Sequence, residues 1–210
     1  MMKHDKIYTM IGLLLLAAAL FLSGYNIWSD IQADRRAEAV RTQLEQGLAD
    51  KEPADDSSDI GSQEEICIPD YLLNPEKEMP TKEVDHRFYI GVLKIPTLSL
   101  ELPVLSEWSY PGLKIAPCRY AGSAYLNNMV IAAHNYSSHF GSLKRLSQGD
   151  EVTFTDMDGN VFRYEVAGIE ILMPYDVEEM MGGDWDLTLF TCTIGGKSRV
   201  TVRCMQTQNF

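Results

Sequence analysis

The apolar and polar residues follow three different patterns along the 210 residues of the chain. Residues 7–28 hold no charged side chain, and about 20 apolar residues are long enough to cross a bilayer. Residues 29–50 place apolar residues at helical spacing among charged ones. From residue 87 onward, short runs rich in β-branched and aromatic residues alternate with Gly, Pro and Ser. The pattern predicts an N-terminal membrane helix, a helical stalk and a β-rich domain.

Composition sets the boundaries between these parts. Residues 51–65 are acidic, rich in Ser and nearly free of large apolar side chains, as in a flexible linker. The segment that follows is punctuated by Pro, and we expect an irregular lead-in on the domain surface. The prediction is therefore a short cytoplasmic tail and transmembrane anchor over 1–28, a helical stalk over 29–50, an acidic linker and irregular lead-in over 51–86, and a β-domain over 87–210.

The apolar segment is predicted to remain as an anchor rather than to be cleaved as a signal peptide. A signal peptide has a shorter apolar region, followed by a small-x-small cleavage site that is poorly represented here. Lys3 and Lys6 precede the segment and Trp28 lies at its far end, but Arg35 and Arg36 lie on the other side. The positive-inside rule thus gives a weak preference for a cytoplasmic N-terminus and an extracellular main domain.

Seven or so short strands with little helix predict an antiparallel barrel or sandwich. The strongest local indication is Asp158-Gly159, which predicts a hairpin within residues 151–172. Residues 156–160 also resemble the start of a calcium loop, but they lack its bidentate Glu, so a turn is the better interpretation. Residues 176–181 suggest one helical turn.

Charge and cysteine spacing narrow the function. A formal net charge of -12 argues against a general nucleic-acid binder, which would carry a basic surface. The four Cys show no C-x-x-C spacing and the four His form no zinc-ligand cluster, so we expect no metal site built from them. Outside the cell, pairing of all the cysteines is the ordinary alternative. The four cysteines are Cys67, Cys118, Cys192 and Cys204.

Cys192 stands out among them because of its surroundings. It ends the strand-like run "TLFTC", and a Gly-Gly turn precedes Arg199 on the next run. A packed thiol, half of a disulfide and a nucleophile are all compatible with this position. A nucleophilic thiol needs a positive or basic neighbour. Arg199 is a poor base but a good oxyanion donor, and His134, at the end of "MVIAAH", is the natural group for proton transfer.

These three segments together resemble the sortases, membrane-anchored cysteine transpeptidases of Gram-positive bacterial surfaces. The "TLFTC" strand end, the later Arg199 and the upstream "AAHN" occur in the family's order, and "FYIGVLKIP" is similar to its opening strands. The resemblance implies a closed antiparallel β-barrel of about eight strands with short helices. It implies Cys192 as nucleophile, His134 as general acid and base, and Arg199 as substrate and oxyanion holder, with Thr191 and Asn135 contacting substrate.

The resemblance also implies a reaction and partners. A sortase cleaves a sorting-signal peptide after Thr and transfers it, through a thioester, to an amine on a cell-wall precursor or a pilin. A hydrolase with the same thioester, or a non-catalytic binding domain on a membrane stalk, are the alternatives. Short spacings around His134 separate the chain from the better-known class B members, so the prediction is class B-like or related, with the class left open.

Nearby residues compete for two of these roles. His139 follows His134 by five residues and lies in a loop, so we expect it to be peripheral. Arg203 shares a strand face with Arg199, and we expect an ordinary surface or groove charge there. No cofactor is predicted. Calcium, which some sortases bind, is less favoured than a solvated acidic loop. The acidic residues concerned are Asp176, Glu178, Glu179, Asp184 and Asp186.

Overall fold

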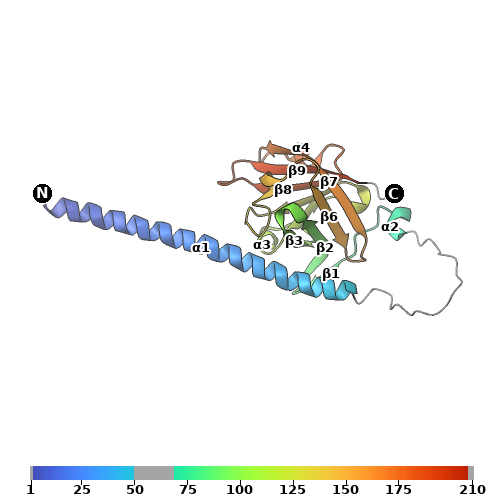
Figure 1. Cartoon of the computed structure of the whole chain (residues 1–210), viewed down its shortest axis with the longest axis horizontal. Coiled ribbons are helices and arrows are strands. Elements are labelled where there is room, and N and C mark those ends of the chain that lie inside the picture. The colour runs from blue at the N-terminus through green and yellow to red at the C-terminus, as the bar shows by residue number, and fades with distance from the viewer. Residues whose placement is uncertain (1, 50–68, 208–210) are drawn as a thin grey trace.

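The structure, a computed structural model, describes residues 2–49 and 69–207, so the predicted acidic linker lies outside the described residues. A single helix, α1, runs from Met2 to Ala49 without a break and joins the predicted anchor to the predicted stalk. Its window Tyr8–Tyr25 has a mean hydropathy of 1.8 and is long and apolar enough to cross a membrane, by length and composition. Figure 1 shows this half of α1 projecting away from a compact β-domain.

Nine strands form one sheet in the described part of the chain. The strands are β1 Lys82–Val84, β2 Arg87–Ile95, β3 Leu100–Leu105, β4 Cys118–Ala121, β5 Met129–Ala133, β6 Glu151–Asp156, β7 Val161–Leu172, β8 Leu187–Cys192 and β9 Arg199–Gln206. The short helices are α2 Asp70–Leu73, η1 Pro96–Leu98, α3 Tyr110–Leu113, η2 Ala124–Leu126, η3 Leu143–Arg145 and α4 Val177–Met181. The helical turn expected at 176–181 and the hairpin around Asp158-Gly159 are both confirmed.

The sheet closes into a barrel because β2 pairs with both β3 and β6. The order of strands around the barrel is β2-β3-β4-β5-β8-β9-β7-β6. Strand β1 is outside this ring and pairs only with the first residues of β2. A bulge between Tyr89 and Gly91 lies at the closure, where a Cβ on Gly91 would come 2.2 Å from the Thr155 carbonyl oxygen. Only glycine allows β2 to approach β6 this closely.

The predicted eight-stranded barrel is confirmed, but it is mixed rather than wholly antiparallel. The β3–β4 and β5–β8 pairs are parallel. The parallel β5–β8 pair requires a crossover connection, and the β6–β7 hairpin on the far wall provides it. Alternating apolar residues reveal short strands but not the direction of their neighbours, so the sequence could not separate the two arrangements.

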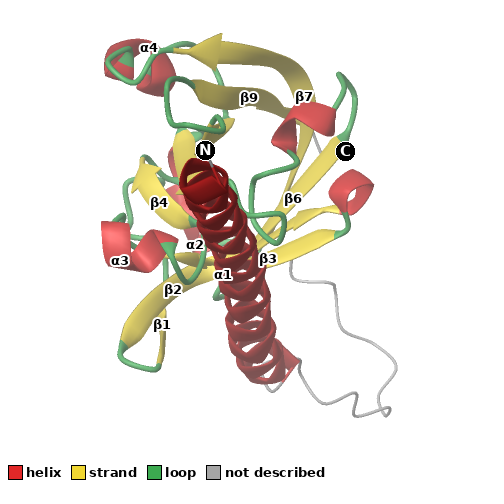
Figure 2. Ribbon diagram, turned by 90° about the vertical axis from the view of Figure 1, so that its left-hand side faces the viewer, coloured by secondary structure: helices red, strands yellow, loops and turns green. Residues whose placement is uncertain are grey.

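The C-terminal half of α1 packs against the barrel instead of standing free as a stalk. Val40 and Leu44 are buried in an outer hydrophobic cluster with Tyr89 and Leu105. Figure 2 shows this part of α1 beside β1, β2 and β3. Pro103 has no backbone N–H group to donate. It is tolerated within β3 because β3 pairs with β4 only at Leu105, so no hydrogen bond to β4 is lost at Pro103.

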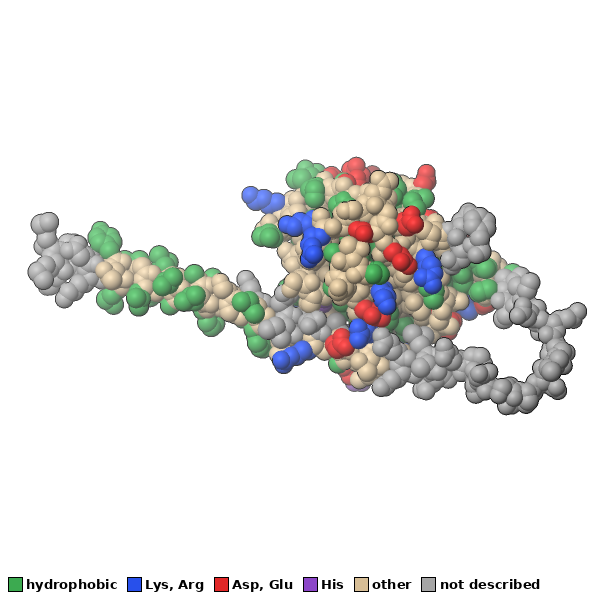
Figure 3. Space-filling model, viewed as in Figure 1, with side chains coloured by type: hydrophobic (Ala, Val, Ile, Leu, Met, Phe, Trp, Pro, Cys, Tyr) green, Lys and Arg blue, Asp and Glu red, His purple; other side chains and the backbone are tan. Residues whose placement is uncertain are grey.

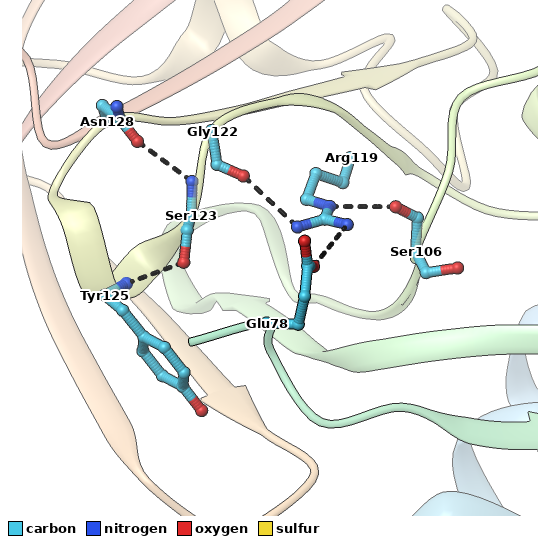
Figure 4. A network of polar contacts seen from close by, with 7 residues as sticks. All are labelled: Glu78, Ser106, Arg119, Gly122, Ser123, Tyr125 and Asn128. Atoms are coloured by element: carbon cyan, nitrogen blue, oxygen red, sulfur yellow. Dashed lines mark hydrogen bonds and ion pairs between the residues drawn. The ribbon is translucent and has the colours of Figure 1, made fainter. Parts of the chain in front are cut away.

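The lead-in is more ordered than the sequence predicted, since it contains α2 and β1. Tyr71 of α2 stacks on Tyr125 with ring centroids 4.8 Å apart. Tyr125 precedes the start of β5, so it lies at the opposite end of that strand from His134. Figure 4 shows Glu78 reaching Arg119 of β4 at an N–O distance of 3.9 Å. The described lead-in is therefore anchored to the barrel through Tyr71 and Glu78.

The turn at residues 156–160 is organised by Asp156 and not by a metal ligand set. Its Oδ1 accepts hydrogen bonds from the backbone N–H groups of Asp158 and Asn160, both at 2.9 Å. Its Oδ2 accepts from the Asn160 amide at 2.8 Å and from the Tyr125 hydroxyl at 2.7 Å. The buried carboxylate is thus satisfied by N–H and O–H donors, and the interpretation as a turn is confirmed.

Candidate active site

Strands β5 and β8 bring His134 and Cys192 to neighbouring strand ends. The two strands run parallel, with Ala133 opposite Thr191, so His134 and Cys192 each follow the last paired residue. Adjacent strands lie about 4.8 Å apart. Ala132 and Phe190, two positions earlier, belong to the outer cluster, so alternation puts the His134 and Cys192 side chains on the outer face as well. Cys192 is partly exposed.

Arg199 joins them from the other side of β8. It is the direct antiparallel partner of Cys192, so both side chains lie on the same face of the sheet. Its Nη1 donates to the carbonyl oxygens of Gly196 and Ser198, both at 3.1 Å. These bonds hold the guanidinium against the β8–β9 hairpin and leave the Nε and Nη2 donors for another acceptor.

Thr191 and Asn135 are placed differently from each other. The Thr191 side chain is buried and its hydroxyl donates to the Ala133 carbonyl oxygen at 2.8 Å. This placement disagrees with the expectation that Thr191 contacts substrate, because alternation turns it to the inner face while Cys192 faces out. The hydrogen bond from the Thr191 hydroxyl joins β8 to β5 instead. Asn135 is exposed immediately after His134, where a substrate contact is sterically available.

The environment of His134 favours the neutral imidazole. Partial burial lowers the pKa of His134, and the nearby charge of Lys114 lowers it further. The ring lies 4.9 Å from that of Tyr136, measured between centroids. The imidazolium form of His134 is therefore disfavoured at neutral pH.

Replacing Lys114 by Gln should raise the pKa of His134. The positive charge of Lys114 disfavours the imidazolium, so its removal stabilises the protonated ring, while burial still keeps the pKa below that of a free histidine. An NMR titration of the His134 ring protons measures the change. Lys144→Gln, on the exposed face of η3, is the matched control and should leave the titration where it is. An unchanged or lower His134 pKa in Lys114→Gln would contradict the assignment of this charge effect.

Residues 93–207 match the sortase domain family. The chain belongs to the sortase family. Sortase A of Bacillus anthracis is 26% identical over 198 residues, which cover 91% of this chain and 89% of that relative. The barrel is also similar to that of Sortase A from Corynebacterium diphtheriae, with a TM-score of 0.53 and 21% identity over 92% of this chain and 97% of the other. The sortase C1 structure from Streptococcus suis gives a TM-score of 0.51 and 25% identity over 58% of this chain and 74% of that one.

Sortases are cysteine transpeptidases, so the predicted enzyme class and fold are confirmed. The relatives named above are sortases A and C, and they do not assign a class to this chain. The match begins inside β2, so α1, the lead-in and β1 lie before the matched region.

Arg203 is not the surface or groove charge that the sequence predicted. It is 3% exposed, pairs with Thr188 in the β8–β9 ladder and donates to its hydroxyl at 3.0 Å. It also donates to Glu170 on β7 at 2.5 Å and to the Met180 carbonyl oxygen at 2.9 Å. Arg203 therefore fixes α4 to the barrel wall, a contact between distant segments that strand periodicity could not reveal.

Arg203→Met should destabilise the fold by about 3 kcal/mol, because it leaves the Glu170 carboxylate and two backbone carbonyl groups without their charged donor. Urea unfolding followed by the fluorescence of Trp108 and Trp185 measures the loss. The matched control is Arg163→Ala on the exposed face of β7, which should change stability by less than about 0.5 kcal/mol. Equal effects of the two substitutions would contradict the role given to Arg203.

His139 is buried within the loop after β5, with its ring 5.5 Å from that of Tyr136. It thus supports, through Tyr136, the loop that carries His134. The loop position agrees with the sequence pattern, and the burial of the side chain could not be predicted from it.

The described cysteines are free thiols, and only Cys192 is accessible among them. Burial raises the pKa of Cys118 to about 11 and that of Cys204 to about 12, so both thiols are protonated at neutral pH. Cys67 lies outside the described residues. No group of three or more potential metal ligands occurs within residues 2–49 and 69–207. In the acidic loop, Asp186 accepts from the Gln206 backbone N–H at 2.6 Å, which is a structural role.

An aromatic row lies beside Cys192, and the sequence pattern does not predict it. The Phe190 ring lies 5.3 Å from Tyr120, which lies 5.8 Å from Trp108, measured between centroids. Trp108 and Tyr120 also line a surface hollow of about 370 Å³. The row runs from β8 across β5 to β4 on the same face as the Cys192 side chain. Each aromatic comes from a separate segment, so no spacing along the chain could indicate it.

Proposed function

We propose that this sortase cleaves a sorting-signal peptide after Thr and joins it to an amine of a peptidoglycan precursor or a pilin. The observation that carries the proposal is the strand register, with Ala133 opposite Thr191 and Cys192 opposite Arg199. It brings a thiol, an imidazole and a guanidinium to one end of three adjacent strands. The domain division predicted from the sequence belongs to the same proposal, with α1 as a single-pass anchor, a cytoplasmic N-terminus and an extracellular barrel.

Each side chain has a defined chemical task in this reaction. The Cys192 thiolate attacks the Thr carbonyl carbon, and the Arg199 guanidinium donates to the oxyanion that forms. Protonated His134 gives its proton to the leaving amide nitrogen as the C–N bond breaks, which leaves a thioester and neutral imidazole. The incoming amine then attacks the thioester, His134 takes the amine proton, and the Cys192 thiolate departs.

Trp108 and Tyr120 give the peptide an aromatic surface, and the buried Phe190 links that surface to the strand that holds the nucleophile. Phe190 is two residues from Cys192, and the hollow next to Trp108 and Tyr120 is open to solvent. Aromatic faces bind apolar side chains and extended peptide segments. We assign this surface to the residues of the sorting signal that precede the Thr, and Asn135 to a polar contact near the scissile bond.

The test uses the full chain in detergent micelles, since removal of α1 would expose the surface that Val40 and Leu44 cover. The enzyme is incubated with a library of Thr-containing sorting peptides, and its intact mass is measured. The expected result is an adduct equal to the acyl fragment, which disappears on addition of an amine as the ligated peptide forms. Release of free acid in the presence of amine would identify a hydrolase instead. No adduct with any peptide, from a folded enzyme with an alkylatable Cys192, would count against the proposal.

A further inference from the structure

The helix that holds the apolar span is fixed rigidly to the barrel. Besides the buried Val40 and Leu44, two polar contacts made by helix residues between these positions join the helix to the barrel. The Arg41 guanidinium lies 3.6 Å from the Glu101 carboxylate of β3. The Lys82 ammonium of β1 donates to the carbonyl oxygen of Gln43 at 3.0 Å. The barrel therefore has one orientation relative to α1 and cannot rotate freely about it.

The docked segment lies close to the end of the span. Tyr25 and Val40 are separated by about 15 residues of unbroken helix, which corresponds to a rise of roughly 22 Å. A domain of roughly 140 residues has a radius of gyration of about 14 Å and thus an outer radius approaching that rise. The edge of the barrel that faces the span consequently comes near the plane where the span ends.

The β8–β9 hairpin, residues 193–198, forms that edge. In Figure 1 the loop joining β8 to β9 extends from the barrel toward the N-terminal half of α1. The backbone of the hairpin is well defined, since Thr193 N–H donates to the Ser198 carbonyl oxygen at 2.9 Å and Gly196 N–H donates to that of Thr193 at 2.8 Å. Gly195 and Gly196 supply the two positive φ angles of the turn, 85° and 72°.

The side chains at the tip combine an apolar and a cationic group. Ile194 is 92% exposed, more than any other large hydrophobic residue in the described part of the chain. Lys197 is exposed on the same turn. In water, the exposed Ile194 side chain does not stabilise the hairpin, because it is not buried against any other residue. An apolar residue beside Lys is the combination that binds the interface of an anionic bilayer.

Neighbouring exposed residues continue this surface. β7 ends beside the hairpin, with Leu172 opposite Arg199, so Met173 and Tyr175 follow at the same end of the sheet. Tyr175 is 76% exposed, and Tyr is enriched at membrane interfaces. Figure 3 shows green and blue side chains on the edge of the barrel toward the exposed apolar half of α1. The acidic residues of α4, Glu178 and Glu179, lie on an element farther from the span in Figure 1.

We propose that the β8–β9 hairpin rests on the bilayer surface, with Ile194 in the interface and Lys197 among phospholipid headgroups. The inference rests on the proposed anchoring by α1. It implies that the nucleophile Cys192, which immediately precedes the hairpin, works at the membrane surface. Substrates that are themselves attached to the membrane would then meet the site without leaving the interface.

Photo-crosslinking in vesicles tests the contact. The full chain is reconstituted in vesicles of phosphatidylcholine and phosphatidylglycerol with p-benzoylphenylalanine in place of Ile194, and lipid adducts are measured by mass after illumination. The same amino acid in place of Leu15, inside the span, reports on anchoring. In place of Leu126, an exposed residue that precedes β5 at the end opposite His134, it provides the matched negative control.

Lipid adducts at positions 15 and 194, with only background at 126, are the expected result. Adducts at 15 but equal background at 194 and 126 would overturn the hairpin contact and leave the anchoring intact. Background at 15 would overturn the anchoring itself. These outcomes separate the two proposals.

Two further variants test the physical cause of the contact. Lys197→Glu should lower the adduct yield at position 194 about fivefold in anionic vesicles but not in pure phosphatidylcholine, because one basic residue near an anionic surface contributes about that factor. An insertion of Gly-Ser-Gly-Ser after Arg36 leaves Val40 and Leu44 in place but releases the barrel from the span. The insertion should reduce the lipid adduct at position 194 to background. Retention of that adduct would contradict the inference that a rigid α1 holds the hairpin on the membrane.

Discussion

Cys192→Ala should abolish transfer of the sorting peptide and prevent the acyl-enzyme adduct. Removal of a catalytic nucleophile lowers the rate by roughly 10⁴-fold or more, and the residual binding groups cannot form a thioester. The fold should survive, because Cys192 is partly exposed and the substitution removes a single sulfur atom at a strand end. We expect a stability loss of about 1 kcal/mol or less. Amide-ligation kinetics and urea unfolding measure the two quantities.

The other thiols of the barrel provide a matched control. Cys118 and Cys204 are fully buried, so Cys118→Ala and Cys204→Ala should retain the adduct, although their stability falls through the cavities they create. Iodoacetamide applied to the folded enzyme in a Cys67→Ser background should modify Cys192 before either buried thiol. An active Cys192→Ala enzyme, or an acyl adduct formed on that variant, would exclude Cys192 as the nucleophile.

The strands of the barrel, and the candidate active site at the ends of two of them, could be predicted from features that are local in sequence. "MVIAAH" and "TLFTC" each predict a strand that ends in a candidate catalytic residue, and the Gly-Gly turn predicts that Arg199 returns beside Cys192. The β8–β9 register confirms this last pairing. A short turn fixes the register of its hairpin, so the pairing of Arg199 with Cys192 can be predicted from the sequence.

Contacts between distant segments could not be predicted in the same way. The parallel β5–β8 pair joins strands separated by a whole hairpin, and Arg203 reaches α4 and β7 across the sheet. Leu44 belongs to an amphipathic helix whose apolar residues did not indicate which surface they would cover. In each case the pattern showed that a side chain needed a partner without specifying the partner.

The inward side chain of Thr191 shows a subtler limit. Its neighbour Cys192 was correctly expected at the strand end, but two consecutive strand residues point to opposite faces. The buried Thr191 hydroxyl bonds the Ala133 carbonyl oxygen and thereby holds the ends of β5 and β8 together. Proximity to the nucleophile in sequence was therefore a poor guide to substrate contact, and the strand register is a better one.

Arg199→Ala should lower kcat/KM by about 10²–10³-fold, because a preorganised oxyanion donor contributes that much to acyl transfer. The two hairpin carbonyl groups hold the guanidinium on the Cys192 face with Nε and Nη2 still available, so an oxyanion there meets a donor already in position. Arg199→Lys should recover only part of the loss, since an ammonium retains the charge but cannot bond both hairpin carbonyls and the oxyanion in one plane.

The split between kcat and KM distinguishes this role from simple peptide binding. An oxyanion donor acts in the transition state, so Arg199→Ala should lower kcat and kcat/KM together. Arg163→Ala, an exposed guanidinium on β7 that pairs with Glu151, is the matched control and should leave both constants within about twofold. A rise in KM at constant kcat would assign Arg199 to substrate binding alone. A loss under tenfold in kcat/KM would remove it from the catalytic group and leave the hairpin carbonyls as the reason for its position.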